Sequence, residues 1–137
     1  MRAVKRKFCR GYTLVEVLMV VFIIAMLASL VTIRYDRQRR QTAVNVTKSN
    51  LESIRTSIAL FYEAEGMYPT SDLSDLVSGS PSGAKYLGAI PAEAINNKNV
   101  VVNIPTYNGG WVYETGMHTV RPNLLGNDIN GNPYSSY

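Results

Sequence analysis

The sequence predicts an α+β protein in which a long N-terminal helix packs against a small antiparallel β-sheet head. Three observations predict this class. Residues 14–33 are apolar or small with a single acid, and residues 34–65 continue without proline or glycine. Residues 66–137 then change to short apolar runs broken by Gly, Pro, Asn and Ser, which is typical of short strands and turns. We therefore expect a helix over residues 13–65, with a membrane-spanning first half and an amphipathic second half.

Residues 1–11 form a basic leader with five Lys and Arg, no acid and the only cysteine, Cys9. From residue 12 onward there are nine Lys and Arg against ten Asp and Glu, so the overall charge of +4 reflects the leader. Because the rest of the chain has no long basic stripe, we expect no nucleic acid partner. If the leader is removed, the mature chain has no thiol for a disulfide or a cysteine metal site.

Residues 12–33 are predicted to form a transmembrane or filament-core helix, because an apolar run of about 20 residues spans a bilayer. Glu16 is the one charge within it. An acid inside a bilayer costs on the order of 2.5–3.5 kcal/mol on insertion scales, so Glu16 requires a partner. A cut after Gly11 would create an α-ammonium group one turn away, which Glu16 could neutralise within its own chain or in an adjoining one.

The basic leader, the sequence Gly11-Tyr12-Thr13-Leu14-Val15-Glu16-Val17 and the long apolar helix resemble the class III signal of type IV pilins and pseudopilins. The resemblance implies cleavage after Gly11 by a prepilin peptidase, which also methylates the new N-terminus, Tyr12. It implies that Glu16 pairs with the N-terminal amine of a neighbouring subunit. Two positions depart from the family: Tyr12 replaces the usual phenylalanine, and Ile33 stands where many members have proline.

The second half of the helix, residues 34–65, is predicted to be amphipathic. Its apolar residues recur at spacings of seven, three, four and three, as expected for a helix with one face on a core. These residues are Val44, Leu51, Ile54, Ile58 and Phe61. Gly66 is expected to end the helix.

The head, residues 66–137, is predicted to contain a short helix over 72–77, capped by Ser71, and strands at 99–104, 110–114 and 118–121. Trp111 is expected to be a core anchor beneath an antiparallel sheet. The order of a helix, a Tyr68-Pro69-Thr70 turn, a loop and a hairpin at 110–121 is similar to the head of type II secretion pseudopilins.

Two interpretations of the loop at residues 126–132 stay open. Asp128, Asn130 and Asn132 alternate oxygen-bearing side chains and resemble the start of a calcium-binding loop. However, the glycine lies two places early for an EF-hand, and no glutamate follows at the twelfth position. Turn formation by Asn and Gly explains the segment equally well. Calcium is therefore the only cofactor considered, and the alternative is none.

We predict a structural subunit rather than an enzyme, because His118 is the only histidine and stands in no catalytic motif. The resemblance implies that the precursor crosses the inner membrane once with its head outside the cytoplasm, then enters a periplasmic or extracellular filament. Expected partners are copies of itself and related pilins, prepilin peptidase, an inner-membrane assembly platform and, before assembly, membrane lipid. A type II secretion pseudopilin is favoured; the alternatives are a major or minor type IV pilin and a signal-anchored binding module that never polymerises.

Overall fold

The computed structural model describes residues 11–137, without the side chains of residues 30–34. Apart from Gly11, the predicted leader lies outside the described residues. The chain divides into two compact units, of which the first ends at Arg37 and the second is Gln38–Tyr137. The boundary lies inside the first helix, close to the predicted division at residue 34.

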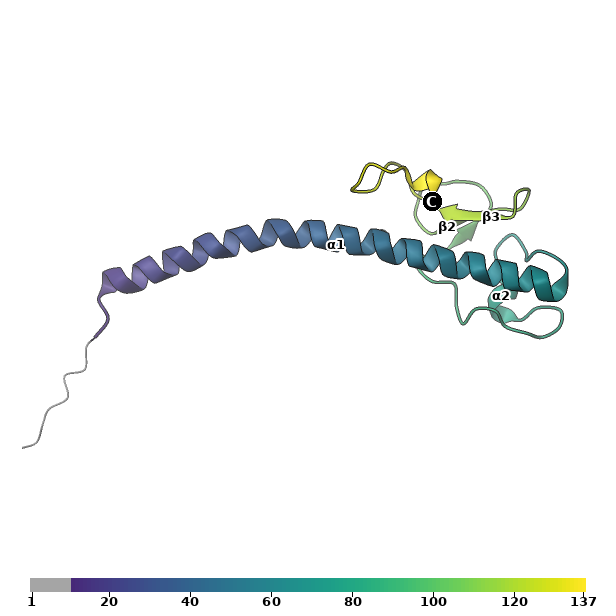
Figure 1. Cartoon of the computed structure of the whole chain (residues 1–137), viewed down its shortest axis with the longest axis horizontal. Helices are drawn as coiled ribbons and strands as arrows, with labels where there is room; N and C mark the ends of the chain where they lie inside the picture. Colours follow the sequence, from purple (N-terminus) through teal and green to yellow (C-terminus); the bar gives the residue numbers. More distant parts are fainter. Residues whose placement is uncertain (1–10) are drawn as a thin grey trace, which may run out of the picture. The chain divides into compact units, whose positions relative to one another are not determined.

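Helix α1, Leu14–Glu65, is 52 residues long and confirms the predicted helix to within one residue at its start (Figure 1). It runs without a break through residue 33, as expected where no proline is present. Gly66 follows it with a φ of +72°, and its N–H donates a hydrogen bond of 2.9 Å to the Tyr62 carbonyl. A glycine in this left-handed conformation is a common helix end.

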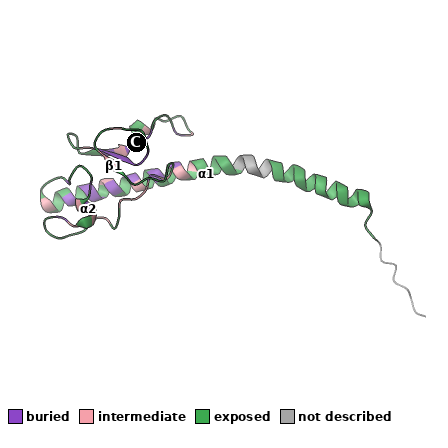
Figure 2. Cartoon of the chain, turned by 180° about the vertical axis from the view of Figure 1, so that it is seen from behind, coloured by how far each residue is buried: buried purple, intermediate pink, exposed green. Residues whose placement is uncertain are grey.

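The predicted apolar stripe on the second half of α1 is confirmed as the core of the second unit. Each of its five residues is at most 5% exposed, and Figure 2 shows the buried residues recurring along this half of the helix. They are Val44, Leu51, Ile54, Ile58 and Phe61. The last four pack in one cluster with side chains from the head: Leu73, Leu76, Trp111, Tyr113 and Val120. One helix face therefore organises the whole head.

The head contains a three-stranded sheet in the order β1-β2-β3, formed by Val101–Val102, Trp111–Glu114 and Thr119–Pro122. Strands β2 and β3 are antiparallel, as predicted, but β1 pairs parallel to β2, so the prediction of an all-antiparallel sheet was wrong. The two-residue β1 is also shorter than predicted. Two glycines precede β2, and a Cβ on Gly110 would lie 2.3 Å from the Val100 carbonyl oxygen. This close approach lets the Trp111 N–H bond the Val100 carbonyl at 2.8 Å and start the parallel pairing.

Helix α2, Asp75–Ser78, is shorter than the predicted 72–77, and Ser71 does not cap it. The residue before the helix is Ser74, whose N–H and hydroxyl both donate to the Asp72 carboxylate. Asp72 therefore organises the turn ahead of the helix rather than its first turn. These hydrogen bonds, with the Ser74 N–H first, lower the pKa of Asp72.

Polar side chains on the second half of α1 hold the irregular parts of the head. Asn50 donates to the Ala92 carbonyl at 2.8 Å, and Ser57 donates to the Tyr86 carbonyl at 3.2 Å. Arg55 donates to the carbonyl groups of Val120 and Tyr137 at 3.1 and 2.7 Å. Within this unit, Figures 1 and 2 show the sheet on one side of α1 and α2 on the other. The core stripe can therefore contact both.

The last residue of α1, Glu65, places a carboxylate at the end of a helix, where the helix dipole disfavours negative charge. Three hydroxyl groups compensate by donating hydrogen bonds to one of its oxygens: Ser80, Ser82 and Tyr86. These bonds, with the one from Ser80 first, lower the pKa of Glu65. The loop at residues 80–86 is thereby fastened to the end of the helix.

Candidate functional site

The bond between Gly11 and Tyr12 is accessible at the start of the described residues. Neither residue belongs to a helix or strand, and Tyr12 is 82% exposed. Gly11 does not have a positive φ, and a Cβ added to it would meet nothing within 4 Å. The described structure therefore gives no local reason for glycine at this position. An enzyme that cuts the bond after residue 11 and requires glycine at that position would provide a reason.

Glu16 lies in the first turn of α1, where the positive end of the helix dipole favours an acid. Its N–H donates to the Thr13 hydroxyl at 3.2 Å, so Thr13 caps the helix. The spacing from Thr13 to Glu16 is that of a capping box, a signal that the sequence analysis missed. The Glu16 side chain is exposed, and in the described part of the chain no hydrogen bond or ion pair reaches its carboxylate. Its charge therefore has no partner among the described residues and remains available to a group beyond them.

The side chains that follow Glu16 are apolar and exposed. Every described residue from Gly11 to Ser29 is exposed, and the large apolar ones are between 50% and 82% exposed. Soluble monomers rarely expose a continuous apolar surface of this extent, so the segment is built to be covered by something else.

No helix in the described part of the chain has an apolar stretch long enough to cross a membrane. The predicted span at residues 12–33 is therefore not confirmed by the structure.

Residues 6–32 match the family model of the prokaryotic N-terminal methylation motif. The chain carries this methylation motif. The match includes Gly11, Tyr12 and Glu16, and it supports a type IV pilin-like or pseudopilin protein. The motif implies processing by prepilin peptidase and assembly with other pilins. No curated protein and no solved structure matches the chain.

The predicted calcium residues lie in the C-terminal loop, outside the methylation motif. Asp128 is buried, and its Oδ1 accepts hydrogen bonds from the N–H groups of Asn130 and Asn132, both at 2.8 Å. Its Oδ2 accepts from the Tyr137 hydroxyl at 2.7 Å and from the Asn132 side-chain amide at 3.1 Å. Lys48 lies 4.0 Å from the same oxygen and 4.2 Å from the centre of the Tyr137 ring. The structure therefore brings Asp128 and Asn132 together as acceptor and donor.

This arrangement is that of a hydrogen-bonded loop, whereas a calcium ion takes six to eight oxygen ligands. Four donors already occupy the two oxygens of Asp128, and Asn132 faces it with its amide nitrogen. The described residues also contain no group of three or more His, Cys, Asp or Glu placed to hold a metal. Burial raises the pKa of Asp128, but the hydrogen bonds from Tyr137, Asn132 and Asn130 outweigh it and hold the pKa well below its usual range. Calcium binding stays a prediction.

Trp111 is fully buried, and its Nε1 donates to the Pro91 carbonyl at 2.7 Å, which confirms its role as a core anchor. His118 lies exposed in the turn between β2 and β3, with a φ of +53°. Its ring stacks on Tyr68 at 3.5 Å between centroids, and Tyr68 stacks on Tyr62 at 4.4 Å. Sequence analysis missed this aromatic stack, because its three members come from α1, the following loop and the hairpin turn.

Proposed function

We propose that this chain is a structural subunit of a type IV pilus-like filament. Its precursor is cut after Gly11, methylated on Tyr12 and assembled through the helix at residues 12–33 with copies of itself and related pilins. The observation that carries the proposal is the exposed apolar segment with one available acid, Glu16, directly after an accessible bond. The methylation motif supports the same conclusion.

The charges explain why the new N-terminus and Glu16 belong together. Cleavage places an α-ammonium beside the positive end of the α1 dipole, which disfavours it, whereas the same dipole favours the Glu16 carboxylate. When neighbouring helices bury these groups, each needs the opposite charge, because an unpaired buried ion is strongly destabilising. A pair between Glu16 of one copy and the amine of its neighbour satisfies both and fixes the axial register of assembly.

The finer proposal is a type II secretion pseudopilin, anchored in the inner membrane before assembly and without enzymatic activity. A head with a three-stranded sheet and no cysteine pair supports it. Residues 66–137 carry three Lys and Arg against five acids, which disfavours a DNA-uptake subunit. His118, the only histidine in the sequence, stands in no catalytic motif, which supports a head without enzymatic activity. A major or minor type IV pilin remains the alternative.

The first test is the intact mass of protein extracted from its native membrane, beside filament incorporation of three variants. We expect a mass of residues 12–137 plus one methyl group. Glu16→Gln, which removes the charge but keeps a polar side chain in the first turn, should be processed and fail to assemble, as should Glu16→Ala. Glu52→Gln changes an exposed acid on the same helix and should assemble normally. An uncut chain together with normal behaviour of Glu16→Gln would mean a signal-anchored module and refute the proposal.

A second test separates the secretion pseudopilin from a pilin. Deleting the gene should abolish export of type II secretion substrates and leave surface pili unchanged, and the wild-type chain should restore export. Loss of pili with normal export would assign the chain to a type IV pilus and refute the finer proposal alone.

A further inference from the structure

An open groove of about 540 Å³ lies between the last turns of α1 and the β2–β3 hairpin. One wall is the aromatic stack of Tyr62, Tyr68 and His118, whose rings lie 4.4 and 3.5 Å apart between centroids. All three residues are exposed. The groove also contains Glu63 and Arg55, so it combines aromatic rings with charge.

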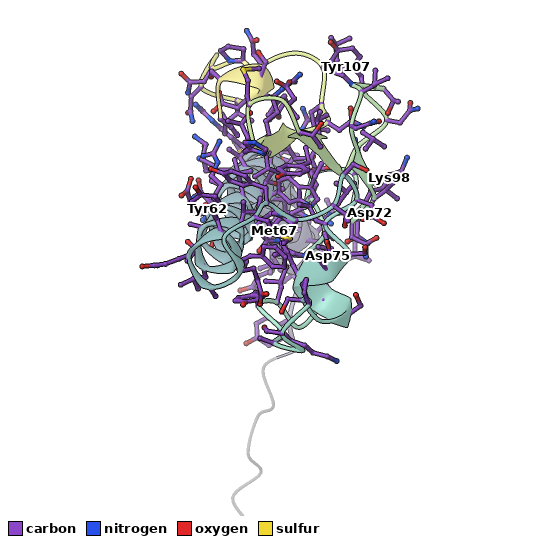
Figure 3. All side chains as sticks on the ribbon, turned by 90° about the vertical axis from the view of Figure 1, so that its right-hand side faces the viewer. Tyr62, Met67, Asp72, Asp75, Lys98 and Tyr107 are labelled. Carbon is purple, nitrogen blue, oxygen red and sulfur yellow. The ribbon has the colours of Figure 1, made fainter. Side chains whose placement is uncertain are left out.

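The two charged groups of the groove differ in what they already bind. Arg55 donates to Glu52 and to the carbonyl groups of Val120 and Tyr137, so its guanidinium is committed within the chain. Glu63 is exposed, and in the described part of the chain it makes no hydrogen bond or ion pair. Asp72 does not line the groove: it accepts hydrogen bonds within its own turn, and Figure 3 shows it away from Tyr62. The groove therefore offers one free carboxylate beside aromatic faces.

Aromatic faces beside a carboxylate form a site for a guanidinium group, which stacks on rings and bonds carboxylate oxygens with its planar fork. The chain itself carries candidates. Arg39 and Arg40 lie on α1 within the same compact unit, are exposed, and make no ion pair among the described side chains. At 1.5 Å per residue, Arg40 and Glu63 lie roughly 35 Å apart along the helix. The two cannot meet within one copy, so any contact requires a second copy.

We propose that the groove binds the Arg39–Arg40 segment of a second copy of this chain. The inference rests on the proposed function, since filament assembly is what would bring two copies together. The contact ties the head of one subunit to the helix of another, at a distance from the Glu16 pair. It gives the head a part in assembly in addition to the apolar helix.

Charge exchange tests this contact in the full chain. Glu63→Arg alone, and Arg39→Glu with Arg40→Glu, should each lower filament yield about tenfold, because like charges then face each other in the groove. Co-expressing the two variants, or combining all three changes in one chain, should restore the yield to within about twofold of wild type. All these residues are exposed, so circular dichroism should show unchanged folding. Failure of the exchange to restore yield in correctly processed protein would overturn this inference and leave the proposed function intact.

Disulfide trapping between co-expressed copies gives a second measurement, in chains that also carry Cys9→Ser. A copy with Glu63→Cys and a copy with Arg40→Cys should form a crosslinked dimer in assembled protein. The matched control pairs Glu63→Cys with Lys85→Cys, an exposed cation of the head, and should form none. Equal crosslinking in both pairs would overturn the inference. A photo-crosslinking amino acid placed at position 62 gives a further check, and a crosslink to a different protein instead of a second copy would also overturn the inference. By contrast, an uncut precursor that forms no filament, with Glu16→Gln behaving like wild type, would count against the proposed function itself.

Discussion

Two stretches of the same helix treat their apolar side chains in opposite ways. From Leu14 to Ser29, every described residue of α1 is exposed, including the large apolar ones. From Val44 to Phe61, apolar residues at helical spacing are buried against the head of the same chain. Both stretches are helical and both are rich in apolar residues. They differ in whether the chain supplies the surface that covers them.

This contrast shows where to look for function in such a chain. The second stretch needs nothing from outside, because its stripe and its polar side chains find partners in the head. The first stretch leaves a large apolar surface and the charge of Glu16 without partners among the described residues. Burying that surface against other copies would release it from water, with a gain of about 25 cal/mol for each Å² covered. The first stretch therefore needs a covering surface that the described part of this chain does not supply.

One matched pair of substitutions on α1 tests whether the two stretches really differ in their contribution to the stability of the head. Phe61→Ala removes a buried ring and should lower the free energy of unfolding of the head by about 3–5 kcal/mol. Phe22→Ala removes an exposed ring, 68% accessible, and should change it by less than about 0.5 kcal/mol. Fluorescence of Trp111, the only tryptophan, reports unfolding of the head in the full chain in mild detergent. Equal losses for the two variants would mean that the first stretch is also part of the folded core.

Much of this division could be predicted from the sequence, because periodicity and breakers are local signals. The absence of glycine and proline from 12–65 located α1, and the spacing of five residues identified its buried face. The parallel pairing of β1 was not predictable in this way. It depends on a close approach between Gly110 and Val100, which are ten positions apart and carry no pattern. The cap of α2 was misassigned because several Ser and Asp side chains in 71–75 compete for the same backbone groups.

The candidate sites also differ in whether their residues are close together in the sequence or are brought together only by the fold. Gly11, Tyr12 and Glu16 lie close together in the sequence, so sequence alone could propose them as a site, and their roles stay a prediction. The aromatic stack and its groove join residues 62, 68 and 118, and only the fold brings these together. For the loop at 126–132, spacing indicated ligands, but it could not show that the Tyr137 hydroxyl and backbone N–H groups occupy the Asp128 oxygens.

A smaller effect is expected from Tyr137, which tests whether buried polar groups of the head are stabilised by hydrogen bonds within the head. Tyr137→Phe removes the hydroxyl that bonds buried Asp128 and should lower Tm by roughly 4–8 °C at neutral pH. Because the folded-state pKa of Asp128 lies below its unfolded value of about 3.9, its charged form stabilises the fold at neutral pH. The difference between wild type and variant should therefore persist through about pH 4 and disappear only as pH falls through the depressed folded-state pKa. Thermal melts from pH 7 to below about pH 2 measure this, with Tyr134→Phe as the control; a difference that vanishes already near pH 4 would contradict the role of Asp128.

Tyr113 marks the one described place where a buried side-chain polar atom of the head has no partner. Its hydroxyl makes no hydrogen bond, and burial raises its pKa. Tyr113→Phe therefore removes an unsatisfied polar atom and keeps the ring, so the free energy of unfolding should stay the same or rise by up to about 1 kcal/mol. Urea unfolding followed by Trp111 fluorescence measures the change. A loss above about 1 kcal/mol would mean that the hydroxyl has a partner, such as a buried water.

The smallest expected effect concerns calcium, and it separates the two interpretations of the C-terminal loop. A ligand that binds only the folded state raises Tm in proportion to its saturation, so calcium binding would show as a difference between millimolar calcium and EDTA. Because four donors already occupy the Asp128 oxygens, we expect the wild-type Tm to agree within about 1 °C in the two conditions. Asp128→Asn should lower Tm equally in both, since it weakens those hydrogen bonds whether or not calcium is present. A calcium-dependent rise in the Tm of wild type that Asp128→Asn abolishes would show instead that the head binds calcium. The head would then also depend on a partner from outside the chain, and the two stretches of α1 would differ less than the structure indicates.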